Sequence, residues 1–229
     1  MKNRGEDSFV SLPGFAARLY DNLVRTKAIE CQHRDIAQDL VSNIEAGRLL
    51  DIGFGPGRLL LEIHRLNSRI ELYGLDISEA MIELAKENLA GLVVDLRRGS
   101  IRHTDYDDDF FDIVTCTGSF YLWNDPIASL EEIYRILKSG RSAYLFETYK
   151  DFSKAEVQRA LKANLREENL ARRLITPVFL RRQLKMAYQT SEIAGIIKRT
   201  DFASSYSLEK IMLGGLPAWV RVRLTKTAT

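Results

Sequence analysis

The 229-residue chain has little cysteine, little net charge and no long apolar run. Its two cysteines, Cys31 and Cys116, can form neither a disulfide framework nor a four-cysteine metal site. No stretch approaches the roughly 18 apolar residues that a membrane span needs, and no apolar signal core follows the first residues. A formal net charge of +2 is too small to favour a nucleic acid or a membrane as partner by itself. These absences lead us to expect a soluble, cytoplasmic protein of a reducing compartment.

Short apolar runs alternate with amphipathic helical patterns from about residue 48 onward. The runs are almost continuously apolar, as is typical of parallel strands that are buried on both faces. They cover residues 48–52, 70–75, 92–96, 111–116 and 142–147. Strands and helices in such alternation imply a doubly wound sheet with right-handed crossovers. Gly214 and Gly215 then separate two final runs, 203–213 and 217–225, as the turn of a hairpin does.

We therefore expect an α/β fold with a doubly wound, Rossmann-like sheet of seven strands, a closing antiparallel hairpin and a helical lid. The chain is interpreted as a single domain, residues 1–229. Its expected parts are an N-terminal helical cap at 10–46, a ligand-binding core at 47–149, a helical lid insertion at 150–190, and a final helix and hairpin at 191–229.

The sharpest motif is a glycine-rich turn between the first apolar run and a helical pattern. Residues 49–58 read Leu-Leu-Asp-Ile-Gly-Phe-Gly-Pro-Gly-Arg. Glycine lets the backbone come close to a ligand, and the free amides at a helix N-terminus can bind an anionic group. A dinucleotide site with the spacing G-x-G-x-x-G needs its third glycine where Arg58 stands, so a nicotinamide oxidoreductase is disfavoured.

Residues 51–57 of this turn resemble the first motif of class I S-adenosylmethionine-dependent methyltransferases. Residues 72–78 (Leu-Tyr-Gly-Leu-Asp-Ile-Ser) resemble the acidic strand end of the same family. Residues 111–115 and 130–138 resemble the fourth strand and following helix of its small-molecule branch, which includes the ubiquinone/menaquinone C-methyltransferases. Residues 17–21 (Ala-Arg-Leu-Tyr-Asp) are similar to the N-terminal segment of that branch. The resemblance implies an S-adenosylmethionine-dependent methyltransferase.

The resemblance assigns cofactor contacts to residues along the core. Asp51 would hold the ammonium of S-adenosyl-L-methionine, Asp76 would bind its ribose hydroxyls, and Thr117 would lie near its sulfonium. Ser100 stands where the family usually has an aspartate, so a shorter and neutral acceptor would face the adenine amine. The other implied cofactor contacts are Tyr20, Gly53, Gly55, Gly57, Ile77, Met81 and Ile101.

Methyl transfer from a sulfonium is an in-line displacement, for which an enzyme mainly orients the donor and the acceptor. A general base is required only where the acceptor loses a proton on attack. Tyr121, Glu147 and His33 are the candidate catalytic residues, chosen from their positions along the chain. No metal is expected, because the acidic run at 105–109 is typical of a solvated loop before a strand.

Segment 150–190 bears on the acceptor, because this branch places its substrate lid after the fifth strand. The segment carries ten Lys or Arg residues and four Asp or Glu residues, with Arg159, Lys162, Arg166 and Arg173 close to one helical face. Such a face is most often only solvated. The excess of positive charge in this segment also favours a small-molecule acceptor that is acidic or amphiphilic.

Two further interpretations stay open. A cofactor-binding protein without methyl transfer is compatible with Ser100 and with the altered turn at 138–141. An RNA methyltransferase would use the basic segment, although the absence of an RNA-binding module in the sequence disfavours nucleic acid as a partner. The acceptor, the methylated atom and the choice between monomer and homodimer also stay open.

Overall fold

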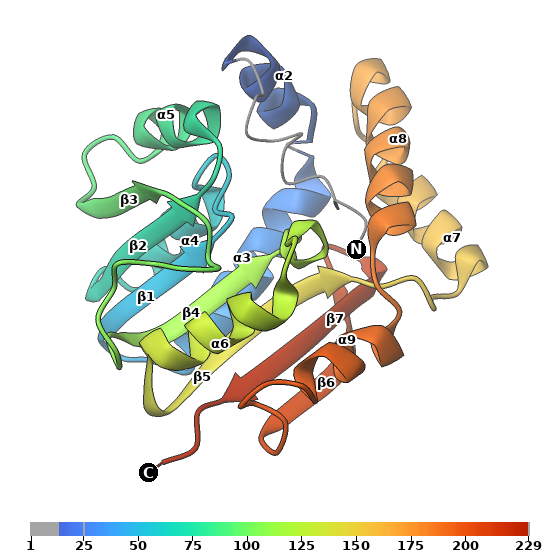
Figure 1. Ribbon diagram of the computed structural model, residues 1–229. Coiled ribbons are helices and arrows are strands. Elements are labelled where there is room, and N and C mark those ends of the chain that lie inside the picture. Colours follow the sequence, from blue (N-terminus) through green and yellow to red (C-terminus); the bar gives the residue numbers. More distant parts are fainter. Residues whose placement is uncertain (1–13, 25, 229) are drawn as a thin grey trace.

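In the computed structural model, which describes residues 14–24 and 26–228, one seven-stranded sheet is covered by helices on both faces (Figure 1). The strands lie in the order β3-β2-β1-β4-β5-β7-β6. Their bounds are β1 Gly47–Ile52, β2 Ile70–Asp76, β3 Val94–Arg98, β4 Phe111–Thr117, β5 Leu137–Thr148, β6 Tyr206–Leu213 and β7 Leu216–Thr225.

Helices follow or connect these strands, as the alternation in the sequence predicts. Their bounds are α2 Gly14–Val24, α3 Lys27–Val41, α4 Arg58–Leu66, α5 Glu79–Asn88, the 3-10 helix η1 Phe120–Leu122, α6 Pro126–Ile136, α7 Lys154–Asn164, α8 Leu170–Met186 and α9 Thr190–Ile197. Helix α6 begins as its sequence indicates, because the Asp125 side chain accepts a hydrogen bond from the Ala128 amide and Pro126 occupies the first turn. Within the described chain, no helix is long and apolar enough to cross a membrane.

The expected α/β topology with a closing hairpin is confirmed. Strands β1 to β5 pair in parallel, whereas β7 runs antiparallel to both β5 and β6. Gly214 and Gly215 form the turn of that hairpin with φ of +54° and +75°. Strand β5 begins earlier than expected, because a bulge between Phe111 and Ile113 lets Leu137 pair before the regular register starts at Ser142.

Two apolar cores, one on each face of the sheet, hold the layers together. On one face α3 and α4 bury side chains such as Leu40 and Leu60 against the strands. On the other face α6 and α9 bury Ile133 and Ile197. The strands between them are therefore covered on both sides, which explains their nearly continuous apolar sequence.

The parallel strands all end at one edge of the sheet, and this edge positions the site. Strands β1, β2 and β4 end there at Ile52, Asp76 and Thr117. Helices α2, α7 and α8 stand over the same edge (Figure 1). Ligands of open α/β sheets bind at the carboxyl ends of the strands, so this edge is where a binding site is expected.

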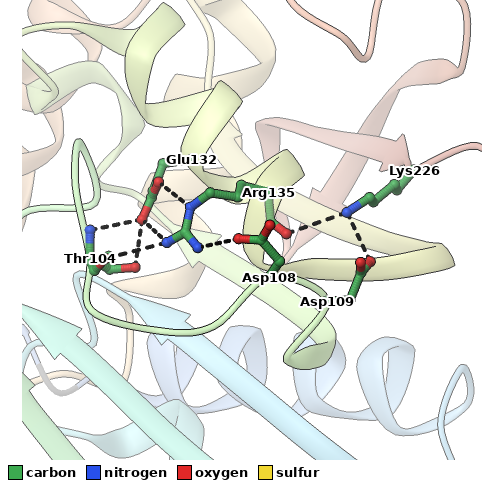
Figure 2. Close-up of polar contacts among 6 residues, drawn as sticks. All are labelled: Thr104, Asp108, Asp109, Glu132, Arg135 and Lys226. Carbon is green, nitrogen blue, oxygen red and sulfur yellow. Dashed lines mark hydrogen bonds and ion pairs between the residues drawn. The ribbon is translucent and has the colours of Figure 1, made fainter.

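The acidic loop before β4 is held by cations from other elements, as Figure 2 shows. Arg135 of α6 bonds Asp108 at 2.6 Å and Glu132 at 2.7 Å, and Lys226 bonds Asp109 at 2.9 Å. Glu132 also accepts hydrogen bonds from the amide and the hydroxyl of Thr104. Two of the loop's carboxylates therefore fix the loop against α6 and the end of the chain. Among the described residues, no group of three His, Cys, Asp or Glu side chains is placed to hold a metal ion.

Candidate functional site

A cavity of about 660 Å³ lies at the carboxyl ends of β1, β2 and β4. We divide it into two halves by the elements that line it. The cofactor half is formed by the loop after β1, the end of β2 and residues 99–101. The acceptor half is formed by α3, α7, α8, the residues after β4 and the β6–β7 hairpin. Its size lies in the range of small-molecule sites.

Three glycines shape the loop between β1 and α4, each with a left-handed backbone. Gly53, Gly55 and Gly57 have φ of +68°, +53° and +75°, which an L side chain adopts only with strain. A Cβ on Gly53 would lie 2.4 Å from the Ser119 hydroxyl, so this glycine lets the loop after β4 approach. A Cβ on Gly55 would meet no atom within 4 Å, which leaves the space above it open to a ligand.

Gly57, the third glycine of the motif, has surroundings that differ from those of the other two. It does not line the cavity. A Cβ there would lie 2.9 Å from the Leu89 side chain and 3.2 Å from the Ala85 side chain. Because glycine has no Cβ, the start of α4 can pack closely against α5. The structure thus brings two of the three motif glycines to the cavity and uses the third for helix packing.

Asp76, at the end of β2, holds the glycine loop through its carboxylate. One oxygen accepts a hydrogen bond from the Gly55 amide and the other from the Ser78 amide, both at 2.9 Å. Burial raises the pKa of Asp76, and these two amide hydrogen bonds oppose that rise. Each oxygen keeps a further lone pair, so the carboxylate can still accept hydrogen bonds from ligand hydroxyls.

Asp51 is a buried acid that pairs with no cation in the described part of the chain. Its side chain is 2 % exposed, and no described side chain donates a hydrogen bond to it or pairs with it. Burial, with a smaller contribution from the Asp76 charge, raises the pKa of Asp51 well above its usual value. A ligand cation at this position would reverse that shift, because an opposite charge favours the ionised carboxylate.

The other sequence-derived cofactor contacts also reach the cavity wall. Ile77, Met81, Ser100, Ile101 and Thr117 all line it. The Thr117 hydroxyl oxygen is buried without a hydrogen-bond partner among the described residues. Buried polar atoms are normally satisfied by protein, water or ligand. Tyr20 belongs to α2, but its side chain lies outside the part of the chain that the structure describes.

The acceptor half is predominantly apolar. Its apolar wall consists of Ile29, Leu122, Leu161, Leu165, Phe179, Leu180, Met186, Leu213, Leu216 and Trp219. Its few polar members include Gln32, Thr176, Arg182 and Gln183. The Trp219 indole nitrogen and the Thr176 hydroxyl are buried without a partner among the described residues. An apolar wall with a few converging polar groups is typical of small-molecule sites.

Arg182 supplies an uncommitted positive charge to this half. It lines the cavity, and it forms no ion pair or hydrogen bond with the described residues. Arg58, the other arginine of the wall, is instead held by Asp21, with its Nε atom 2.7 Å from a carboxylate oxygen. Arg159 and Arg166, which the sequence pattern singled out, do not reach the cavity. The sequence reasoning therefore missed Arg182, which differs from its basic neighbours only in the direction it faces.

The three candidate catalytic residues have different surroundings. His33 of α3 and Tyr121 of η1 both line the cavity. Burial and the nearby Arg58 charge lower the pKa of His33 to about 4, so its imidazole is neutral near pH 7. Glu147 does not line the cavity, which argues against direct contact with an acceptor.

Glu147 lies beneath the residues that follow β4. One carboxyl oxygen accepts hydrogen bonds from the Ser119 and Phe120 amides at 2.9 and 2.8 Å. The other oxygen is buried without a partner among the described residues. Burial raises the pKa of Glu147 to about 8, so the group is protonated near neutral pH. Its position at the end of β5 makes it a support for η1, which carries Tyr121.

The helices over the cavity are tied to the core and to each other. Helix α2 is joined to α4 by the Asp21–Arg58 pair and to α5 by an ion pair between Arg18 and Glu87. The α7–α8 turn is joined to α3, because the Glu168 carboxylate accepts a hydrogen bond from the Lys27 amide at 2.9 Å. These contacts hold the helices in place over the cavity.

Comparison with known proteins places the core in a family. Residues 50–145 match the family described as a methyltransferase domain. The chain is 35 % identical over 95 residues to the uncharacterized methyltransferase YdaC of Bacillus subtilis, covering 42 % of this chain and 52 % of that protein. It is 29 % identical over 131 residues to the ubiquinone/menaquinone biosynthesis C-methyltransferase UbiE of Geotalea daltonii, covering 55 % of this chain and 56 % of that protein. The chain spans about half the length of these curated relatives.

Solved structures share the fold over nearly the whole chain. The plantazolicin methyltransferase BpumL, in complex with a triazolic desmethylPZN analog and SAH, has a TM-score of 0.72 at 17 % identity, covering 99 % of this chain and 96 % of its own. A SAM-dependent methyltransferase from Aquifex aeolicus has a TM-score of 0.66 at 15 % identity, covering 94 % of this chain and 99 % of its own. The solved structures show the fold, and the family match over residues 50–145, together with the glycine loop and the acids of β1 and β2, supports a class I S-adenosylmethionine-dependent methyltransferase that resembles the ubiquinone/menaquinone C-methyltransferases.

Proposed function

We propose that this protein transfers a methyl group from S-adenosylmethionine to a small amphiphilic acid. The observation that carries the proposal is the continuity of the cavity. A half built from the glycine loop, Asp51 and Asp76 opens directly into an apolar half that contains Arg182, which is unpaired among the described residues. Such a cavity suits a polar, positively charged donor beside a largely apolar acceptor.

The residues of the cofactor half fit S-adenosylmethionine on structural grounds. Buried, unpaired Asp51 fits the ammonium of the methionine part, and the space above Gly55 admits its backbone-like atoms. Asp76 retains lone pairs for the ribose hydroxyls, while Ile77 and Met81 offer apolar surface to the adenine. When bound, the cofactor supplies an electrophilic methyl group on a sulfonium.

The protein's contribution to the transfer is chiefly orientation. The wall holds two molecules end to end, and holding reactants in line can supply roughly 7–11 kcal/mol of the barrier. Thr117, at the end of β4, stands between the two halves with its hydroxyl unpaired among the described residues. We place the reacting atoms near this residue, where an acceptor in the apolar half would meet the donor.

The acceptor class follows from the composition of the second half. Leucine, phenylalanine and methionine side chains of α7 and α8 would bury an apolar body, and Arg182 would bind an acidic group. Names of the relatives support a small-molecule acceptor, since they include demethylmenaquinone methyltransferase and malonyl-[acyl-carrier protein] O-methyltransferase. No nucleic acid is required by this proposal.

Proton handling is assigned to groups near the acceptor. His33 is neutral near pH 7, and its unprotonated ring nitrogen would accept a hydrogen bond from an acceptor hydroxyl, which makes it an orienting group and, at a pKa of about 4, a weak base. Tyr121 would orient the acceptor through its hydroxyl. Glu147 is a positioning residue in this proposal, because it holds the amides at the start of η1 and does not reach the cavity.

The test is turnover on a panel of small acceptors. Purified protein is incubated with S-adenosylmethionine and a set of aromatic and aliphatic carboxylic acids, together with their methyl esters or amides. We expect formation of S-adenosylhomocysteine and a methylated product for acids with an apolar body, and much less for their uncharged counterparts. Binding of the cofactor without turnover on any small molecule, or methylation of RNA alone, would contradict the proposal.

A further inference from the structure

The helix that covers the acceptor half also carries an apolar surface that faces away from it. Leu170, Leu174 and Val178 of α8 are 72 %, 64 % and 65 % exposed. They follow one another at a spacing of four residues, so they lie on one face of the helix. Phe179 and Gln183 of α8 line the cavity and lie on the opposite side of the same helix. Helix α8 is therefore apolar toward the cavity and apolar toward solvent.

Basic side chains continue this exposed ridge, and others are exposed on the preceding helix α7. Arg181 and Lys185 extend the same helical face toward the C-terminal end of α8. Arg159, Lys162 and Arg166, from α7 and the turn after it, are exposed as well. None of these five cations forms an ion pair with the described residues.

The acidic residues of the same segment do not neutralise these cations. Three of its four acids are paired elsewhere: Asp151 with Lys210, Glu167 with Lys27, and Glu168 with Arg172. The fourth, Glu156, is exposed on α7 and forms no ion pair with the described residues, so it offsets one of the exposed cations of that helix. Arg181 and Lys185 therefore continue an apolar ridge that no other part of the described chain covers. Exposed apolar side chains and unpaired lysines and arginines on one face can bind an anionic bilayer, because apolar burial and attraction to the headgroup charge act together.

We propose that the outer face of α8 docks on an anionic lipid bilayer. The ridge Leu170–Leu174–Val178 would enter the boundary between headgroups and acyl chains, and Arg181 and Lys185 would contact the phosphates. Charge complementarity selects a bilayer over a second copy of this chain, because two such faces would bring their unpaired cations together. The inference concerns a surface outside the cavity, so it stands or falls separately from methyl transfer.

The test is cosedimentation of the full chain with vesicles. Vesicles of phosphatidylcholine alone are compared with equimolar mixtures of phosphatidylcholine and phosphatidylglycerol, at low and at high salt. We expect binding to the anionic vesicles only, weakened as salt rises because the charges are exposed. Absence of binding to anionic vesicles at low salt would overturn the proposal.

Matched double variants locate the surface. We expect L174E/V178E to weaken vesicle binding roughly tenfold or more, because two apolar side chains leave the interface. The control L66E/V93E makes the same exchange at two exposed residues far from α8 in the sequence. We expect this control to bind vesicles as the unmodified chain does. In the same way R181E/K185E should lose binding. The control R69E/K198E makes the same change of charge in the loop before β2 and at the residue after α9, and it should bind more strongly than R181E/K185E.

Folding and self-association are measured on the same proteins. Thermal unfolding by circular dichroism shows whether each variant is folded. Because all the substituted residues are exposed, we expect every variant to unfold at about the same temperature as the unmodified chain. Sedimentation velocity gives the oligomeric state without lipid. If L174E/V178E converted a dimer to a monomer and left vesicle binding unchanged, the ridge would be an interface between copies of this chain and the proposal would be wrong. Equal losses in L174E/V178E and L66E/V93E would also overturn it.

Discussion

The two halves of the cavity are built in different ways. The cofactor half depends on backbone geometry: glycines with positive φ and an aspartate that binds two main-chain amides. The acceptor half depends on the size and direction of side chains from α3, α7, α8 and the β6–β7 hairpin. A backbone-built site tolerates little change in sequence, whereas a wall of side chains can be altered one residue at a time. The comparison explains why the cofactor can be inferred with more detail than the acceptor.

The largest expected effect is loss of cofactor binding in Gly55→Val. A side chain there would enter the open space above the loop, in a backbone conformation that L residues rarely adopt. We expect S-adenosylmethionine affinity to fall by more than roughly a hundredfold, about 3 kcal/mol, as measured by calorimetry. Gly91→Val is the matched control, because Gly91 also has positive φ and open space but lies away from the cavity. Equal losses in both variants would mean that strain alone explains the effect.

The second effect is a pH dependence of cofactor affinity. The pKa of Asp51 is raised in the free protein, and pairing with the ligand ammonium would lower it. Binding of the cofactor then releases a proton from Asp51. Its affinity should therefore rise with pH in the acidic range, by up to about tenfold per pH unit, and this rise should end before the ligand amine itself titrates. Calorimetric titrations at several pH values check the slope. Asp51→Asn should bind weakly with little dependence on pH, and a slope that persists in this variant would contradict the assignment.

The third effect is on stability. The pKa of Glu147 is raised to about 8 in the folded protein, so the folded state keeps a proton that the unfolded chain loses above about pH 4.5. This contribution to stability is complete below about pH 4.5 and is lost as pH rises toward 8. Glu147→Gln removes this titration. The difference in free energy of unfolding, variant minus unmodified chain, should therefore become more positive by roughly 2–4 kcal/mol between about pH 5 and pH 9. Urea unfolding measures this, with exposed Glu156→Gln as the control that should show no such trend.

The smallest effect concerns the acceptor half alone. Arg182→Gln should raise KM for an acidic acceptor about tenfold, because a charged hydrogen bond is lost, and leave S-adenosylmethionine affinity unchanged. Arg181→Gln removes the same charge one residue earlier, on the outer face of α8, and should leave KM unchanged in the absence of lipid. Steady-state kinetics with an acid and its methyl ester separate the two variants. A shift in cofactor affinity in Arg182→Gln would show that the two halves are not independent.

Most of the fold and of the cofactor half could be predicted from the sequence. Five apolar runs and a Gly-Gly turn predict the seven strands, because buried parallel strands and tight hairpins have strong local signatures. Asp51 and Asp76 stand at strand ends, where the topology itself brings them together. Gly57 shows the limit, since the motif alone does not tell a glycine that faces a ligand from one that admits a neighbouring helix.

The acceptor half could not be predicted for a physical reason. Selecting Arg159 and Arg166 assumed that helical spacing continues along the segment, but α7 ends at Asn164 and α8 begins at Leu170. A break between helices resets which residues face inward. Helix α8 has apolar residues on both sides, so periodicity does not reveal its inner face or single out Arg182. Glu147 likewise ends a strand near the site, and only the contacts show that it supports η1 from beneath.

The most direct test of the central claim is a calorimetric titration of the full chain with S-adenosylmethionine, S-adenosylhomocysteine and NAD, repeated with Asp76→Asn. Asp95→Asn is the control, since Asp95 lies on the neighbouring strand β3 and is paired with Arg97 outside the cavity. The account predicts that both sulfur ligands bind, that NAD does not, and that only Asp76→Asn loses the binding. Binding of NAD, or sulfur-ligand binding that survives in Asp76→Asn, would contradict the assignment of the cofactor half.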